Sequence, residues 1–488
     1  KVTGDVISNG GIVTLGGRGV YVRGTLNVTG GTFDVINGTV DSLSGTANGT
    51  LNGNLIINRA SNTVYSGVMS GGGGVSISGG VQSFSGQNTY TGDTTVNSGG
   101  ALLLSGSIAG NLINNASATN PSVIASSGAV YGNMVNNGHI SVNGTVGGQT
   151  TNSKLGILQA SSNAVFAQSF TNMGTATLSG ASTIKGDLTN AVDGTFSLTN
   201  SSKIMGNVNN AGTANINTGA EVAGNFVNST ILNMDSGTIS GTLSNTGVMS
   251  IQNKSVVQSV ENKSGTATFS NSTINGSAVN ASGGTLTING GTVGSATNAG
   301  KMTLADNNTV LNTVTSSSGA LTLDGNTIDG KLLVTGGNFT VTDNGTSLGT
   351  LEGTADGTLE GLLNITAAGD TYSGILSGSG GVSINSAGQE IFTGNNTYTG
   401  TTEINSGTLV VNGNQSNATG DTFINASANL SGTGTLGGNP TLLAGARLTP
   451  GDVTSHVGTL TIANNLTLSN GTSQNFYMGQ TNVFGGAY

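Results

Sequence analysis

Residues 187–228 read DLTNAVDGTFSLTNSSKIMGNVNNAGTANINTGAEVAGNFVN, and asparagine recurs in this stretch at a nearly fixed interval. Asn190, Asn210 and Asn228 stand 20 and 18 residues apart. The same spacing extends in both directions and gives the series Asn115, Asn137, Asn152, Asn172, Asn190, Asn210, Asn228, Asn245, Asn262, Asn280 and Asn298. A period of roughly 18 residues is too long for a helical turn or a strand. It predicts successive coils of a parallel β-solenoid, stacked at ~4.8 Å.

Apolar residues repeat with the same period and predict three strands per coil. The first column contains Leu198 and Ile216, and the second contains Ile204 and Val222. The third column is expected to contain Val208, Phe226, Leu243, Val260, Val279 and Val314. Alternation along a strand should send these residues inward and the intervening Thr, Ser and Asn residues outward.

Turn-forming residues also repeat and predict three corners. One corner is the asparagine series, whose amides can hydrogen-bond to each other along the axis. A second is Asn200, Asn217, Asp235, Asn253, Asn271, Asn289, Asn307, Asp324 and Asp343, and the third is mostly glycine, from Gly206 to Gly330. Gly and Asn tolerate the positive φ of tight corners. We therefore predict an all-β fold: a single right-handed parallel β-helix over residues 1–488, with triangular coils and about 24 rungs at the strand spacing.

One passage occurs twice. Residues 43–104 resemble residues 351–411, and Asn88-Thr-Tyr-Thr-Gly92 recurs at 396–400. The expected sub-regions are N-terminal coils at 1–42, a first insert module at 43–110, regular coils at 111–350, a second insert module at 351–411 and C-terminal coils at 412–488. The two longer modules either project from the prism, with Tyr65, Val68, Met69 and Tyr372, Ile375, Leu376 beside their Gly-rich tips, or form extended coils that pack within the stack. Both alternatives stay open at this stage.

The composition narrows the class of protein. Only 7% of the residues are charged and 84 of 488 are glycine, as in some disordered tracts, but disorder gives no reason for a regular apolar period. Absence of cysteine fits a chain exported unfolded through an oxidising compartment. A net charge of −9 disfavours nucleic acid as a partner. No stretch is apolar enough to span a bilayer as a helix. No signal peptide begins at Lys1, so any export signal is expected either to have been removed or to lie outside this sequence.

Three passages carry a family resemblance. Ser85–Gly99 (SGQNTYTGDTTVNSG) and Thr393–Gly407 (TGNNTYTGTTEINSG) resemble the passenger-associated repeat of bacterial autotransporters, as does the region from Gly432 (GTGTLGG) to Leu468. Among these proteins the chain looks most like the AIDA-like, self-associating adhesins of Gram-negative bacteria. The resemblance implies a β-helical passenger at the bacterial surface, or secreted, with a C-terminal outer-membrane β-barrel that is not part of this sequence. It also implies homotypic association between cells, biofilm formation, attachment to surfaces and a contribution to virulence.

An enzyme is the main rival class, because polysaccharide-cleaving proteins also use parallel β-helices. Asp306, Asp324 and Asp343 are 18 and 19 residues apart and are expected to line one edge, and Lys331 is the only basic residue in 324–370. These carboxylates could be solvated corner residues, a strip facing a ligand or cation, or an acid/base pair. Arginine is absent between Arg59 and Arg447, which leaves no arginine base there.

Other catalytic signatures are weak. His139 and His456 are too far apart for a triad or a metal cluster, and G-x-S-x-G at 345–349 is a chance match in a chain rich in Gly and Ser. We expect no enzyme activity, catalytic residue, cofactor or metal. The first hypothesis is an adhesin that self-associates by extended polar contacts. The second hypothesis is a protein that binds a host glycan or matrix protein in a groove along one face. The third is a polysaccharide-cleaving enzyme. The candidate ligand-binding residues are Asp235, Asn253, Asn271, Asn289, Asp306, Asp324 and Asp343.

Overall fold

The computed structural model describes residues 1–17, 19–452, 454–455 and 457–477. The strands of these residues belong to two compact units, which are taken separately below: unit 1 is residues 1–243 with 247–249, and unit 2 is residues 244–246 with the chain from 250 onward. The boundary falls inside the range 111–350. The regular structure of the described residues is β throughout, with no α-helix among them. None of their segments is therefore a helix that could cross a membrane.

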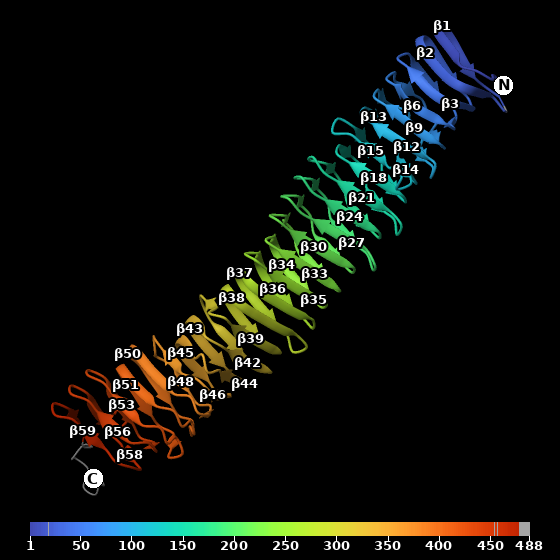
Figure 1. Cartoon of the computed structure of the whole chain (residues 1–488). Helices are drawn as coiled ribbons and strands as arrows, with labels where there is room; N and C mark the ends of the chain where they lie inside the picture. The colour runs from blue at the N-terminus through green and yellow to red at the C-terminus, as the bar shows by residue number, and fades with distance from the viewer. Residues whose placement is uncertain (18, 453, 456, 478–488) are drawn as a thin grey trace. The chain divides into compact units, whose positions relative to one another are not determined.

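Coils of three parallel strands build unit 1 (Figure 1). Two successive coils are β24 (Thr175–Leu178), β25 (Thr183–Ile184) and β26 (Leu188–Asn190), then β27 (Thr195–Leu198), β28 (Lys203–Ile204) and β29 (Val208–Asn210). Each strand pairs in parallel with the strand on the same side of the next coil: β24 with β27, β25 with β28 and β26 with β29. The predicted parallel solenoid with three sides is confirmed.

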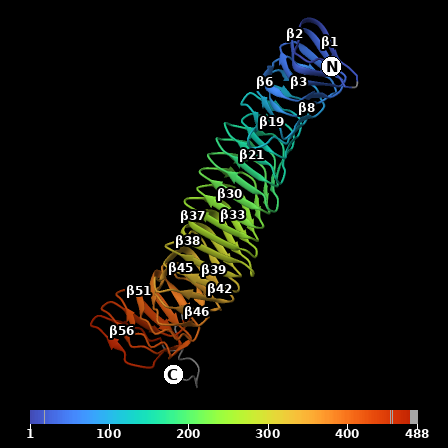
Figure 2. The same ribbon diagram turned by 45° about the vertical axis from the view of Figure 1, so that its right-hand side comes forward.

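Unit 2 repeats this plan with sides that run into one another. Its strands include β42 (Ala320–Leu323), β43 (Asn326–Val334), β44 (Asn338–Val341), β45 (Thr346–Gly353) and β46 (Asp356–Leu359). β43 and β45 each cover two sides of a coil, and their register shifts between Ile328 and Lys331 where the chain turns the corner. The rotated view in Figure 2 shows the strands of this unit stacked on one another. Over the described residues the two units together hold about 25 turns.

Stacked apolar side chains fill the interior of each unit. Leu198 pairs with Ile216 and Ile204 with Val222, as the sequence pattern predicts, and all four are buried. One member of the third column is wrong. Val279 points outward, and Ala278 is the buried residue between Ala296 and the preceding coil. The apolar pattern predicts the wrong one of these two neighbours, because valine is the more strongly apolar residue and alanine the weaker one.

The glycine corner holds the coils in close contact. A Cβ on Gly224 would lie 2.4 Å from the carbonyl oxygen of Gly206, and a Cβ on Gly294 would lie 2.4 Å from that of Gly276. Real Cβ atoms do not approach so closely, so this corner admits almost no side chain. On the outer surface of unit 1, Lys203 and Glu221 of neighbouring coils form an ion pair, with 2.7 Å between Nζ and Oε2.

The two duplicated passages lie within the stack. Tyr65 is fully buried and pairs with Gly45 on one side and Phe84 on the other, and Met69 pairs with Gly49. In the second copy, Tyr372 and Leu376 are buried in the same way. Val68 of the first copy and Ile375 of the second face outward. The structure therefore favours the extended coils over projecting inserts. The coils are slightly longer here: Ile57, Ile77 and Val96 stack at steps of 20 and 19 residues.

Candidate binding surface

The asparagine series forms a ladder of side-chain amides inside the solenoid. In unit 1, Asn152 donates from Nδ2 to Oδ1 of Asn172 at 2.8 Å, Asn172 to Asn190 at 2.7 Å and Asn190 to Asn210 at 2.7 Å. In unit 2, Asn262 donates to Asn280 at 2.9 Å and Asn280 to Asn298 at 2.9 Å. All these residues are fully buried. The predicted bonding along the axis is confirmed, but the amides point inward, so the ladder holds the fold and is closed to ligands.

Two members of the predicted series are wrong by one position. The buried rungs are Asn114 and Asn136, with Nδ2 of Asn114 donating to Oδ1 of Asn136 at 2.8 Å. Asn115 and Asn137 lie on the outside and form a separate amide pair, with 2.9 Å between Nδ2 of Asn137 and Oδ1 of Asn115. The sequence has two adjacent asparagines at both places, so spacing alone could not choose between them.

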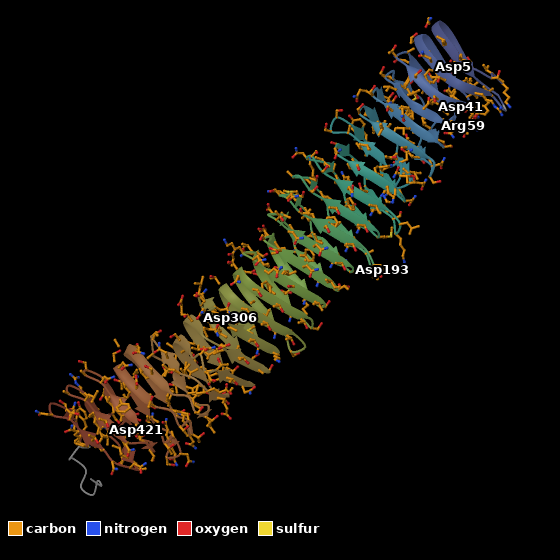
Figure 3. All side chains as sticks on the ribbon, in the orientation of Figure 1. Asp5, Asp41, Arg59, Asp193, Asp306 and Asp421 are labelled. Atoms are coloured by element: carbon orange, nitrogen blue, oxygen red, sulfur yellow. The ribbon has the colours of Figure 1, made fainter. Side chains whose placement is uncertain are left out.

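The seven candidate ligand-binding residues all lie at or near coil corners. In unit 1, Asp235 is half-buried at the end of β33 (Ile231–Asp235) and pairs with Asn217. In unit 2, Asn253, Asn271, Asp306 and Asp343 are exposed, and Asn289 and Asp324 are half-buried. Asn253, Asn271 and Asp306 have positive φ, as expected of corner residues. Figure 3 labels Asp306 on the yellow-green coils.

The three aspartates Asp306, Asp324 and Asp343 do not form one column. Leu323 pairs with Leu304 and with Val341, so Asp324 stacks between Ala305 and Thr342. Asp306 and Asp343 each lie one residue beyond that level. The expectation of a single carboxylate edge is therefore wrong, because the coils here differ in length by one or two residues. The register gives no facing pair of carboxylates to support acid/base chemistry.

Asp324 instead accepts hydrogen bonds from the next coil. Its Oδ1 accepts from Oγ1 of Thr342 and from Nδ2 of Asn344, each at 2.6 Å. Asn344 also lines a shallow groove of about 430 Å³, together with Ser347, Asn364, Ser383 and Asn385. The groove thus lies directly beside a candidate acidic residue.

Amides and hydroxyls at outward strand positions form a second, external ladder along this groove, in which Asn385 is exposed, Asn364 is half-buried and Ser383 is only 3% exposed. Ser347 pairs with Asn364, and Asn364 with Ser383, in adjacent coils. Nδ2 of Asn364 donates to Oγ of Ser347 at 2.8 Å, and Nδ2 of Asn385 donates to Oγ of Ser383 at 2.8 Å and to Oδ1 of Asn364. These bonds fix the orientation of the amides while leaving Asn385 exposed. The arrangement offers donors and acceptors at one-coil intervals along the face.

The acidic stretch 324–370 contains a small ion network. Lys331 Nζ pairs with Glu352 Oε2 and with Asp370 Oδ2, the latter at 3.1 Å. Hydrogen bonds to Glu352 first and Asp370 second raise the pKa of Lys331. Lys331 is thus a charged partner for the two acids. Across the described residues, no three His, Asp or Glu side chains gather closely enough to hold a metal ion.

The repeated Asn-Thr-Tyr-Thr-Gly motif has a structural role. Asn88 is buried and its Oδ1 accepts from the backbone N of Met69 at 3.0 Å, and Asn396 accepts from Leu376 at 2.8 Å. The hydroxyls of Tyr90 and Thr94 are 2.5 Å apart in the core. Each motif therefore fastens its coil to the preceding one.

Two buried polar residues were not identified from the sequence. Gln82 and Glu390 are fully buried at matching places in the two repeats, and both oxygens of Glu390 lack a hydrogen-bond partner among the described residues. Their sequence signal is a polar residue two positions before a core phenylalanine, Phe84 or Phe392.

The remaining sequence candidates contribute no site. His139 is half-buried in β18 (His139–Val142), and His456 lies outside the described residues. Ser347 of the G-x-S-x-G match stands in β45, and no helix follows it. The strand-to-helix elbow that this motif needs is thus missing from this part of the fold.

Comparison with known proteins agrees with this fold. The passenger-associated-transport-repeat family matches residues 78–104 and 385–411, which include the two buried positions 82 and 390. Over 119 residues the chain is 39% identical to a protein of Brucella suis biovar 1 (strain 1330) named "Adhesin BmaC autotransporter". The aligned stretch is 24% of this chain and only 4% of that relative's length.

The two matched repeats and the parallel solenoid together support a class: the passenger domains of autotransporters. Over the aligned stretch, the chain is similar to a protein named as an autotransporter adhesin.

Proposed function

We propose that the chain is an adhesive passenger displayed at the bacterial cell surface, which binds copies of itself on neighbouring cells and thereby promotes aggregation, biofilm formation and attachment. The external amide and hydroxyl ladder from Ser347 to Asn385 is the observation that carries the proposal. The similarity to a protein named as an adhesin supports the same class of function.

Repetition supplies the affinity in this proposal. A single intermolecular hydrogen bond contributes about 0.5–1.5 kcal/mol net, which alone is too little for association. Two copies of the same ladder laid side by side present donors and acceptors at the same spacing, so many such bonds can form together. Many copies on each cell add avidity. The low proportion of charged residues, 7%, limits repulsion between like faces.

The test is aggregation of cells that display the chain. Asn364→Lys with Asn385→Lys places two cations on the external ladder and should keep displaying cells dispersed. Thr358→Lys with Ser377→Lys is the matched control, because these residues pair with each other on another side of the same coils, and it should leave aggregation unchanged. Wild-type cells that stay dispersed at every density, together with a purified chain that is monomeric at every concentration, would refute self-association.

The groove beside Asp324 supports a second candidate, binding of an extended host glycan or matrix protein. Asn344 connects the two features, since it lines the groove and donates to Asp324. Asp324→Lys with Asp343→Lys should abolish binding to an array of glycans and matrix proteins. Binding that is unchanged by this charge reversal would remove the candidate.

A further inference from the structure

The first repeat contains a buried side-chain amide that replaces missing backbone pairing. Gln82 lies in β9 (Gly80–Phe84), whose register with the preceding strand shifts at a bulge after Ser61. Its Oε1 accepts from the backbone N of Leu43 at 3.2 Å, and its Nε2 donates to the backbone O of Leu43 at 3.0 Å. The same amide bonds Thr63 through both the hydroxyl and the carbonyl, each at 3.1 Å. Gln82 therefore acts as both donor and acceptor, as a peptide group would.

Glu390 occupies the equivalent place in the second repeat. Gln82 pairs with Leu102 and Glu390 pairs with Leu409, which are corresponding residues of the two copies. Gln82 also precedes Phe84 by two positions, as Glu390 precedes Phe392. Glu390 lies in β50 (Val382–Phe392) and is as fully buried as Gln82. The two repeats thus differ at one buried position by a carboxyl in place of an amide.

The surroundings of Glu390 disfavour a carboxylate anion. Its oxygens accept no hydrogen bond of ordinary geometry from the described residues, and an unsolvated charge without partners is costly to bury. A protonated carboxyl has one O–H donor and one carbonyl acceptor, which is the same pair of functions that the Gln82 amide uses. The protonated form can therefore replace the amide, whereas the anion has no donor.

The negative charge of Asp370 acts in the same direction. Burial is the largest cause, and with the negative charge of Asp370 it raises the pKa of Glu390 to about 8, although backbone N–H groups of Gly369, Asp370 and Leu351 lower it in part. Asp370 is itself paired with Lys331, which also holds Glu352.

Among the described residues, the strands that pair with β50 place no further charged side chain directly opposite Glu390. Opposite it, β51 (Thr402–Val411) places the uncharged Leu409. In β48 (Thr371–Tyr372), Tyr372 keeps its phenol neutral, because burial raises the pKa of that group.

We propose that Glu390 is a proton-binding site, whose protonated carboxyl takes the place of the Gln82 amide, and that loss of this proton loosens the second repeat (385–411) and leaves the first repeat (78–104) unchanged.

The direction of the pH dependence follows from the linkage between proton binding and folding. The carboxyl binds its proton more tightly in the fold than in an opened coil, where the pKa returns to about 4.5. The stabilising effect is therefore complete below the pKa of the opened state and is lost as the pH rises toward the pKa of the folded state. Between about pH 5 and 8 the opening equilibrium of the second repeat should grow close to tenfold per pH unit relative to that of the first.

Hydrogen exchange measured by mass spectrometry on the whole chain tests this directly. The ratio of protection between peptides from 385–411 and peptides from 78–104 cancels the intrinsic pH dependence of exchange, because both lie in one molecule. We expect the ratio to fall steadily across pH 5–8 in the wild type and to stay constant in Glu390→Gln. Gln82→Glu should transfer the same dependence to the first repeat. Glu403→Gln, at an exposed position of β51, is the control and should behave like the wild type.

A second measurement uses the wild type alone and does not depend on whether a variant folds. The chain has six glutamates, so labelling their side-chain carboxyl carbons with ¹³C gives a small set of resonances. One resonance, that of Glu390, should titrate near pH 8. If every glutamate of the folded wild type titrates below pH 6, or if the protection ratio of the wild type is independent of pH, the proposal is wrong.

Discussion

Nδ2 of Asn172 donates a hydrogen bond of 2.7 Å to Oδ1 of Asn190, one coil further along the chain. Asn190 in turn donates to Oδ1 of Asn210 at 2.7 Å and to the backbone oxygen of Thr213 at 3.0 Å. The Asn190 amide therefore links its coil to the preceding one through its oxygen and to the next one through its nitrogen. These asparagines are fully buried, so water does not compete for the bonds. Stability of a solenoid depends on such contacts between neighbours, since a single coil buries little by itself.

Removing one rung of this ladder should be costly. Asn190→Ala leaves Oδ1 of Asn210 and the carbonyl oxygen of Thr213 without the Asn190 donor. The amide nitrogen of Asn172 loses one acceptor and keeps the backbone oxygens of Gly174 and Thr195. We expect a loss of about 1–3 kcal/mol for each buried group left unpaired, measured by denaturant unfolding. Asn209→Ala removes an exposed asparagine from the adjacent position and should change the unfolding free energy by less than about 0.5 kcal/mol. Equal effects of the two variants would contradict the structural role of the ladder.

The close contact between coils at the glycine corner predicts that a side chain added there destabilises the fold. Gly224→Ala forces a Cβ to within 2.4 Å of the Gly206 carbonyl oxygen, so the coils must separate there. The expected destabilisation is about 1–3 kcal/mol, visible as a lower thermal midpoint. Gly72→Ala meets no atom within 4 Å and should leave the midpoint unchanged or slightly raised. A Gly224 variant as stable as the wild type would mean that the coils are not in close contact at this corner.

The buried tyrosines of the two repeats should matter through their hydroxyls. The hydroxyl of Tyr65 donates to the carbonyl of Ala47 at 2.6 Å, and that of Tyr372 donates to the carbonyl of Ala355 at 2.5 Å. Replacing either with phenylalanine keeps the ring and leaves one buried carbonyl unpaired, which should cost about 1–3 kcal/mol. Tyr131→Phe, at an exposed position, is the control and should be neutral in the same unfolding assay.

The Lys331 ion network should contribute little at neutral pH. Its carboxylate partners raise the pKa of Lys331, so its contribution is complete below the pKa of the unfolded chain and is lost only as the pH rises through the higher pKa of the folded chain. The lysine side chain is 32% exposed, and solvent screening should keep the effect of Lys331→Gln below about 1 kcal/mol at pH 7. In 1 M salt, used to screen the pair, about half of this difference should disappear. A larger, salt-independent loss would indicate a role in packing.

Much of the fold could be predicted from local spacing. The recurrence of Asn172, Asn190 and Asn210 identifies coil length, and the columns of Leu198 and Ile204 identify two of the three sides. The errors arose where spacing is ambiguous. Paired asparagines at 114–115 and 136–137 shift the ladder by one residue without changing its period, and Val279 has a stronger apolar signal than the buried Ala278. Only the pairing of strands fixes such a register.

The candidate site was less predictable. Asp306, Asp324 and Asp343 are separated by near-constant steps, yet coil lengths vary by a residue or two, and this is enough to move side chains out of one column. Gln82 and Glu390 were missed because a polar residue inside a strand normally faces solvent. Gln82 lies beside a bulge in the neighbouring coil, which the sequence does not display.

The sequence by itself determined that this chain is a three-sided parallel solenoid containing two copies of a passenger-associated repeat, because a stacked coil imposes its period on every side chain in it. Only the tertiary structure decided which asparagines face inward, which aspartates share a level, and that a carboxyl in one repeat replaces an amide in the other. Those outcomes depend on register between coils, and register is set by backbone pairing across about 20 residues of separation, where a shift of one position reverses inside and outside.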